Sequence, residues 1–451
     1  MKQYISLFFM FFLFFSSNKI NSQDFTNLKV SPSGEIKCAT VENELLLNAA
    51  DASHATVQEF ENWILAKISE NKNDPAQRNV SEIITIPVVV HILSNGDLIG
   101  VNENLANVRV FSQIQVLNED FRKILGTPGF NDSEVGADTE IEFCLAQRKP
   151  DGTASNGIDR ITVSQGSFNS RTDIETMKAT TQWDPLRYFN IWVVNVGGSV
   201  NNLLGYAQFP SASGLPGINF NGGAANTDGI VVSYTSFGSQ AIANVGVYTA
   251  INNRGRTATH EMGHALGLRH IWGDGNGNFQ TGVTDCSATD YCADTPTAGY
   301  LHYGCETDSD TCFDDFPDMV ENYMDYSEDT CMNIFTNDQK TRMMAVMNNS
   351  IRRKELKTSN ACSAPLGIND MDNNKAIKIY PNPTSTFLNY VITNDAEVSS
   401  IYINDIAGKE IFRNDNAASP TPINVSGLSA GVYFITFKSD KNSTTKKFIK
   451  E

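Results

Sequence analysis

Three histidines within eleven residues constrain the fold of this chain more than any other feature. His260 and His264 lie four residues apart, a spacing that places two side chains on one face of an α-helix. Gly267 allows the helix to end in a left-handed turn, after which His270 can return to the same point. The sequence therefore predicts a helix over about 253–268 that brings three imidazoles together.

Three imidazoles can hold one zinc ion and leave its fourth position open for water. Structural zinc sites use four protein ligands, so three ligands are typical of a catalytic site. Glu261 lies between the first two histidines and can take a proton from the bound water. A chance His-Glu-x-x-His on a helix is the alternative, but Gly267 and His270 at fixed offsets disfavour it.

Length and charge set limits on the class of protein. A chain of 451 residues is long enough for two or three folding units. Its net charge of -17 disfavours a nucleic-acid partner, because phosphate binding needs clustered Lys and Arg. An acidic surface instead favours solubility and hard cations.

The N-terminus has the pattern of a secretory signal peptide. Lys2 precedes an apolar run from Ile5 to Phe15, which is too short to span a membrane and is followed by polar residues. We predict a signal peptide over residues 1–22; an uncleaved anchor is the alternative. The rest of the chain has no apolar run of spanning length, so we expect a mature protein without a membrane span.

Breaker-rich stretches divide the remaining chain. We predict a pro-segment over 23–82 with a helix near 57–65, a catalytic domain over 83–357, a linker over 358–372 and a β-sandwich over 373–451. Apolar periodicity predicts strands at 84–93, 141–146, 190–194 and 229–233, and helices at 104–121, 253–268 and 337–348. Strands separated by helices indicate an α/β catalytic domain. Short alternating strands are expected at 377–380, 400–403 and 431–437.

Eight cysteines in an exported chain favour disulfides over free thiols. Five of them lie between 286 and 331, a region without helical or strand periodicity, so covalent bonds are expected to hold it. Their spacing does not match the paired Cys-x2-Cys of a structural zinc site. The sequence alone leaves the pairing open.

The full pattern His260-Glu261-x-x-His264-x-x-Gly267-x-x-His270 resembles the metzincin zinc motif. Over about 84–347 the chain is similar to the pappalysin family, in particular its cytophagalysin branch. The supporting stretches are Pro87–His91, Asn118–Phe121, Gly229–Val232, Asp294–Pro296 and Asn322–Tyr326. The resemblance implies an α/β metzincin-type fold with a twisted sheet and a zinc helix. It also implies that Met324 lies in a tight turn beneath the metal and that Tyr326 stabilises the tetrahedral intermediate.

Further roles follow from the same resemblance. It implies disulfides between Cys286 and Cys312 and between Cys305 and Cys331. Cys292 has no partner in that scheme, and we expect it to pair with Cys144 in the predicted strand at 141–146. The resemblance also implies a calcium ion; its oxygen ligands would come from Asp290, Ala293, Asp294 and Thr295, although these could equally be solvated loop residues.

Cys38 in the predicted pro-segment could occupy the open zinc position and keep the enzyme latent. A plain free thiol or a bond to Cys362 are the alternatives. Arg78 is a plausible activation cut, since family members often cleave after Arg.

The C-terminal residues resemble the type A sorting domain that directs proteins through the type IX secretion system of the Bacteroidetes. The matching stretches are Ile379–Pro383, Asn404–Lys409, Leu428–Tyr433 and Lys446–Lys450. The resemblance implies an exported, extracellular or surface-attached protein that meets this machinery; an adhesion-type sandwich is the alternative.

We therefore predict a secreted zinc metalloendopeptidase acting on proteins or peptides. By resemblance, Asp329 lines the substrate pocket and cleavage falls on the carboxyl side of Arg or Lys. The rival hypothesis is a surface adhesin with a structural zinc site, but an intact Glu261 argues against it, because a structural site has no use for a general base. His91 is expected to be a core residue, and His302 has no predicted role.

Overall fold

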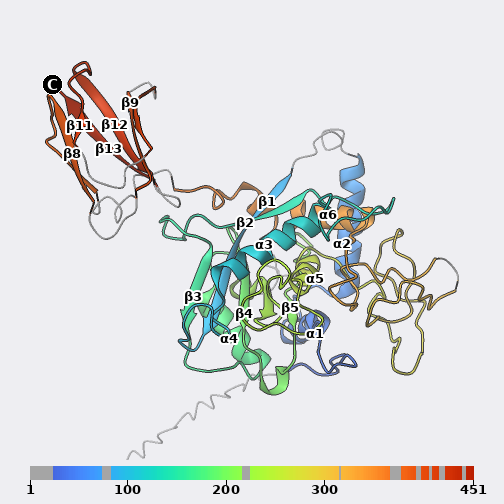
Figure 1. Ribbon diagram of the computed structural model, residues 1–451. Helices are drawn as coiled ribbons and strands as arrows, with labels where there is room; N and C mark the ends of the chain where they lie inside the picture. Colours follow the sequence, from blue (N-terminus) through green and yellow to red (C-terminus); the bar gives the residue numbers. More distant parts are fainter. Residues whose placement is uncertain are drawn as a thin grey trace, which may run out of the picture. The chain divides into compact units, whose positions relative to one another are not determined.

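The computed structural model describes residues 24–73, 83–215, 224–313, 316–365, 377–392, 398–405, 409–415, 422–438 and 443–451. The chain forms two compact units, Met1–Ala364 and Pro365–Glu451 (Figure 1). The predicted signal peptide and Arg78 lie outside the described residues. No helix in the described part of the chain is both long and apolar enough to cross a membrane.

A mixed sheet forms the centre of the first unit. Its strands run in the order β2-β1-β4-β6-β5, and β3 also pairs with β1. All the pairs are parallel except that of β5 with β6, so β5 is an antiparallel edge strand. The strands are β1 (Ile84–Ser94), β2 (Ile141–Leu145), β3 (Ile158–Thr162), β4 (Phe189–Val194), β5 (Gly205–Ala207) and β6 (Ile230–Ser233).

Both faces of this sheet are covered. Along β4, Ile191 and Val193 point into one hydrophobic core, whereas Trp192 and Val194 point into another, as the two-residue period of a strand requires. The first core also contains apolar residues of α3 (Asn107–Phe121), α5 (Arg256–Ala265) and α6 (Asn337–Asn349). The second contains Ile174 of α4 (Arg171–Thr181) and the N-terminal residues Phe25 and Ile36. Short 3-10 helices lie at Gly198–Val200, Ala225–Thr227 and Lys354–Thr358.

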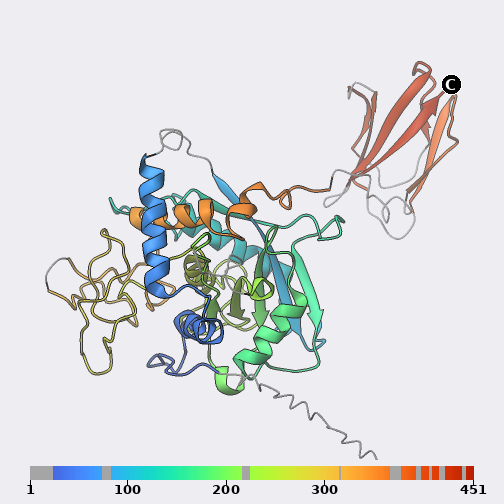
Figure 2. The ribbon, with the colours of Figure 1, turned by 180° about the vertical axis from the view of Figure 1, so that it is seen from behind.

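The predicted pro-segment packs onto this unit through two helices, α1 (Thr40–Ala50) and α2 (Val57–Asn73). Helix α2 lies beside α6, as Figure 2 shows from behind. Helix α1 contacts the edge strand β5. The predicted pro-segment therefore covers the same side of the unit on which the edge strand lies.

The cysteine-rich region between α5 and α6 has no helix or strand in its described residues. Two disulfides cross it, Cys286–Cys312 and Cys305–Cys331, as the resemblance implied. The expected pair of Cys144 with Cys292 is wrong: Cys144 is bonded to Cys362, and Cys292 is a buried free thiol. Cys362 reaches strand β2 because residues up to Ala364 belong to the first unit, and the amide of Gln147 donates to the carbonyl of Ala361. The same pairing excludes a bond between Cys38 and Cys362.

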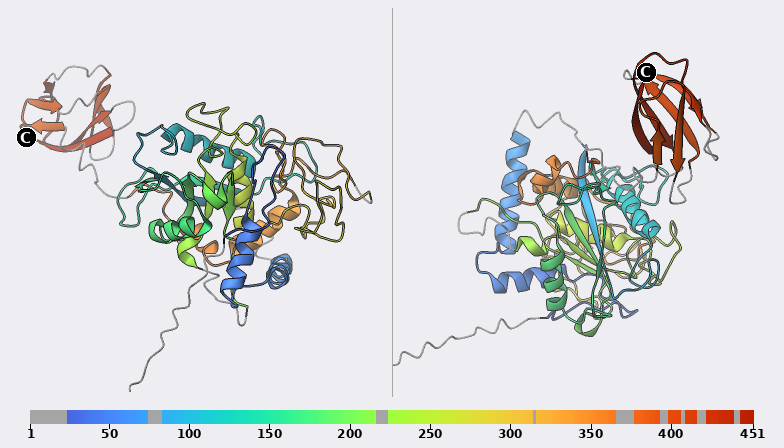
Figure 3. Two further views of the ribbon diagram at one scale, coloured as in Figure 1. Left: turned by 90° about the horizontal axis from the view of Figure 1, so that it is seen from below. Right: turned by 90° about the vertical axis from the view of Figure 1, so that its left-hand side faces the viewer.

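The second unit is a small all-β domain. One sheet has the order β10-β9-β12-β13 and the other the order β11-β8-β7. Figure 3 shows the strands of this unit in orange and red. Residues from both sheets, among them Leu388, Ile403 and Ile435, form a single core. The strands are β7 (Ile377–Tyr380), β8 (Phe387–Ile392), β9 (Ser400–Asp405), β10 (Glu410–Asn414), β11 (Ile423–Asn424), β12 (Gly431–Lys438) and β13 (Ser443–Lys450).

Candidate active site

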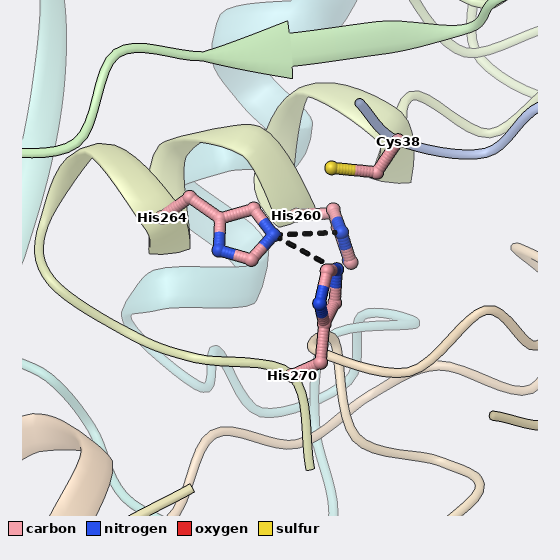
Figure 4. A group of neighbouring side chains, drawn as sticks. All are labelled: Cys38, His260, His264 and His270. Carbon is pink, nitrogen blue, oxygen red and sulfur yellow. Dashed lines mark hydrogen bonds between the residues drawn. The ribbon is translucent and has the colours of Figure 1, made fainter. Parts of the chain in front are cut away.

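The three histidines meet as the motif predicted. Helix α5 presents His260 and His264 on one face, and the chain turns at Gly267, whose φ of +91° is in the left-handed region. The Nε2 atom of His264 lies 3.2 Å from that of His260 and 3.0 Å from that of His270. Figure 4 shows the three rings grouped together, with the Cys38 side chain beside them.

The outer nitrogen of each ring has an acceptor. The Nδ1 atoms of His260 and His264 lie 2.7 and 2.8 Å from the carbonyls of Tyr323 and Leu268, and Nδ1 of His270 lies 2.5 Å from Oδ1 of Asp274. These partners favour a proton on Nδ1, which leaves three Nε2 lone pairs facing one point. Burial, followed by the neighbouring histidines, lowers the pKa of His260 and of His264. Such convergent, neutral nitrogens fit a zinc ion with imidazole ligands.

Glu261 lies fully buried beside this group. Its Oε2 accepts a 2.8 Å hydrogen bond from the Thr40 hydroxyl and lies 3.4 Å from the Cys38 sulfur. Gly205 on the edge strand permits this position, because a Cβ there would lie 2.9 Å from Cγ of Glu261. Burial raises the pKa of Glu261 to about 8, although the Thr40 hydrogen bond acts in the opposite direction.

The turn around Met324 passes beneath the helix. Met324 is fully buried, and its sulfur approaches Gly263 so closely that a Cβ at Gly263 would collide with it. The ring of Tyr326 lies 5.1 Å from that of His270 and 5.8 Å from that of His260. Its hydroxyl donates to the carbonyl of Cys38 at 3.2 Å. Met324 therefore packs against the histidine helix and Tyr326 lies beside two of the histidine rings, while their roles in the reaction stay predictions.

Asp329 is fully buried and takes part in an ion pair. Its Oδ2 accepts the backbone N–H groups of Arg254 and Arg256 at 2.9 and 3.1 Å. Its Oδ1 lies 3.2 Å from Nζ of Lys37, one residue before Cys38 in the predicted pro-segment. An adjoining cavity of about 310 Å³ is lined by Lys37, Tyr326 and Glu328, among others.

Sequence reasoning missed His302. Its Nδ1 lies 2.7 Å from Asp325 and its Nε2 lies 2.8 Å from Asp318. Burial lowers the pKa of His302, but the carboxylates of Asp325 and Asp318 outweigh it and raise the pKa to about 10. The protonated imidazole of His302 therefore links the cysteine-rich region to Asp325, which lies between Met324 and Tyr326. A histidine spaced far from two aspartates in sequence gives no signal of this contact.

The expected calcium ligands lie in one loop with partners of their own. The Thr295 hydroxyl donates to Asp290 at 2.8 Å, and Ala293 donates its N–H to Asp338. Oδ2 of Asp294 accepts the backbone N–H of Asp338. Burial raises the pKa of Asp290 to about 7. In the described part of the chain, the one group that meets the geometry of a metal site is that of Cys38 and the three histidines.

Two family models match parts of this chain. The family model described as "Pregnancy-associated plasma protein-A" matches residues 172–348, and that of a secretion system C-terminal sorting domain matches 378–451. An extracellular metalloprotease of Colletotrichum graminicola is 38% identical over 261 residues, covering 58% of this chain and 75% of the relative. The chain belongs to the pappalysin family of metallopeptidases. A second relative, an extracellular metalloprotease of Arthroderma gypseum, is 28% identical over 62% of this chain and 78% of its own length.

Two solved structures are similar to this pappalysin-family chain. Mature mirolysin of Tannerella forsythia, in complex with a cleaved peptide, is 38% identical, with a TM-score of 0.51, over 62% of this chain and 97% of its own. A promirolysin mutant of the same organism is 35% identical, with a TM-score of 0.52, over 67% and 94%. This chain is a secreted, extracellular or surface-attached metallopeptidase with a metzincin fold and a C-terminal sorting domain, and its family implies zinc.

Proposed function

We propose that this protein is a zinc-dependent endopeptidase in which His260, His264 and His270 hold the metal and Glu261 is the general base. The convergence of three Nε2 atoms beside a buried carboxylate carries the proposal. Zinc held there would acidify a bound water and polarise the scissile carbonyl. Glu261 takes the proton of that water and delivers it to the leaving amine. The Tyr326 hydroxyl, once released from the carbonyl of Cys38, donates to the oxyanion.

We propose that the described chain is a latent precursor. Cys38 contributes the fourth member of the metal-binding group, so its thiolate would exclude the catalytic water. Thr40 holds Glu261, and Tyr326 is engaged by the carbonyl of Cys38. One short stretch of the pro-segment therefore occupies the groups that the reaction needs. In this proposal the pro-segment spans 23–82, the catalytic domain 83–357 and the linker 358–372, ahead of the sorting domain at 373–451.

Asp329 supports a preference for basic side chains. An anionic group that already binds the Lys37 ammonium can bind an Arg or Lys of a substrate in the same way. Cleavage on the carboxyl side of that residue stays our prediction. Mapping the ends of peptide products by mass spectrometry tests this prediction. Cuts on the amino side of the basic residue would contradict it, and would show that the bound substrate has the opposite chain direction to the pro-segment.

We also keep calcium binding by the 290–295 loop as a proposal. Oδ1 of Asp294 is buried and has no hydrogen-bond partner among the described residues, so its lone pairs are available to coordinate a calcium ion. Isothermal titration of the metal-stripped protein with calcium, in the wild type and in Asp294→Asn, tests this. Equal heats in both proteins would contradict the proposed ligand set.

The sorting domain implies contact with a secretion machinery, and the peptidase domain implies protein or peptide substrates. Digestion of a denatured protein by the matured wild type and by Glu261→Ala, each with measured zinc content, tests the proposed activity. Zinc-loaded wild type that cuts nothing would favour the adhesin hypothesis.

A further inference from the structure

Two buried arginines of the catalytic domain face two carboxylates of the pro-segment. Arg269, directly before His270, pairs with Glu44 of α1 at 2.5 Å and with Glu61 of α2 at 3.1 Å. Arg342 of α6 pairs with the same Glu61 at 2.8 Å. None of the four side chains is more than 5% exposed. These ion pairs join the pro-segment to the enzyme independently of Cys38.

The charges of this group depend on each other. Both terminal nitrogens of the Arg269 guanidinium donate to the Glu44 carboxylate, and its Nε donates to Glu61. If a buried guanidinium loses its carboxylate partner, its positive charge is left uncompensated, which is strongly unfavourable. The Arg269–Arg342 pair therefore forms a site on the catalytic domain that is complementary to two carboxylates on adjacent helices.

Apolar contacts surround the ion pairs. Phe60 of α2 meets Phe209 edge to face at 4.9 Å, and Phe60 and Ile64 share one core with Val346 of α6. The indole N–H of Trp63 donates to the carbonyl of Ser213 at 3.0 Å. The guanidinium of Arg269 lies 4.0 Å from the centre of the Phe209 ring. This is the arrangement of an amphipathic helix in a groove, with charges at its centre.

We propose that this groove keeps the pro-segment bound after the chain between α2 and β1 has been cut. The cut removes one covalent link but leaves every contact of Glu44, Glu61, Phe60 and Trp63 in place. Because Cys38 and Thr40 belong to the same segment, its retention keeps the active site covered. The segment then acts as a non-covalent inhibitor of the enzyme, and activation requires its own removal or degradation. The predicted inhibition of the enzyme rests on the proposed function, whereas the predicted retention of the cut segment does not.

Controlled cleavage of the full-length protein tests this. A recognition sequence for a sequence-specific protease is inserted between Gln77 and Arg78, the protein is cut, and the pieces are separated by gel filtration. We expect the pro-segment to co-elute with the enzyme and peptidase activity to stay within twofold of the uncut precursor. Release of the segment on the first pass through the column would overturn the proposal, whether or not the enzyme is active.

Single-charge variants identify the contacts responsible. Glu61→Gln and Glu44→Gln are each expected to raise the dissociation rate of the cut segment at least about tenfold, because truncating a buried pair acts on dissociation. Glu70→Gln removes one charge from the same helix at a side chain that is 62% exposed, and should leave the rate unchanged. Thermal melting of the uncut variants verifies that they fold. Wild-type dissociation rates in both Glu61→Gln and Glu44→Gln would contradict the role of the ion pairs.

Discussion

The hydroxyl of Thr40 donates a 2.8 Å hydrogen bond to Oε2 of Glu261, while its oxygen accepts the backbone N–H of Ala207 at 2.8 Å. The proposed pro-segment thus fixes the proposed general base to the edge strand of the sheet, in addition to bringing Cys38 to the three histidines. Latency in this account depends on two neighbouring residues with different chemistry.

Replacement of Cys38 separates these two contributions. Cys38→Ala should give uncut precursor with peptidase activity at least about tenfold above wild type, equivalent to about 1.4 kcal/mol of lost inhibition. The double variant Cys38→Ala with Thr40→Val should be more active still, because Glu261 is then free as well. Initial rates on a fluorogenic peptide measure both. Precursor of Cys38→Ala that is as inactive as wild type would rule out the cysteine switch.

Asp274 should control zinc affinity. Its carboxylate accepts from Nδ1 of His270, and such outer partners typically change metal affinity by about 10- to 100-fold. We expect Asp274→Asn to weaken zinc binding within that range in competition titrations with a chromophoric chelator. The matched control is Asp285→Asn, because the Asp285 side chain forms its hydrogen bonds within its own loop. Equal affinities in the two variants would contradict this role.

Asp329 should determine selectivity for basic residues. Asp329→Asn keeps an oxygen for the N–H groups of Arg254 and Arg256 but loses the charge that binds Lys37. We expect kcat/KM for an Arg-containing peptide, relative to its norleucine analogue, to fall about 10²-fold, in line with loss of a buried charge pair worth 2–5 kcal/mol. An unchanged ratio would place the pocket elsewhere.

His302 should stabilise the first unit in a pH-dependent way. Its pKa is raised from 6.5 to about 10 in the folded protein, so the stabilisation is complete below about pH 6.5 and is lost as the pH rises through 10. His302→Leu leaves Asp318 and Asp325 without their cation and should cost about 3–5 kcal/mol at pH 6. Urea unfolding at pH 6, 8 and 10.5 measures this. If the difference in unfolding free energy between variant and wild type does not shrink at pH 10.5, the proposed charge interaction of His302 with Asp318 and Asp325 is contradicted.

The elements with strong periodicity could be predicted from the sequence. The β-branched run of β1, the apolar stripes of α3 and α6, and the histidine helix with its glycine turn all lie where they were expected. Local patterns suffice there because one face of each element is buried. Helices α1 and α4 and the short strands β3 and β5 were missed, since their residues are mostly polar or too few to show a period.

Contacts between distant segments could not be predicted in this way. Cys144 meets Cys362, 218 residues away, because the end of the first unit returns to strand β2. The contacts of Thr40, Lys37 and Glu61 depend on how the pro-segment lies across the sheet edge. No spacing in the sequence indicates that path. The motif therefore predicted the group of three histidines, whereas the contacts of Thr40 with Glu261 and of Lys37 with Asp329 were not predicted.

Zinc content and proteolysis, measured on the same matured samples of wild type and Glu261→Gln, test the central claim most directly. We predict about one zinc per chain in both proteins, chelator-sensitive cleavage of a protein substrate by the wild type, and a rate lower by about 10²–10⁴-fold in the variant. Zinc-loaded wild type without cleavage, or equal rates in the two proteins, would contradict the assignment of this site as a peptidase centre.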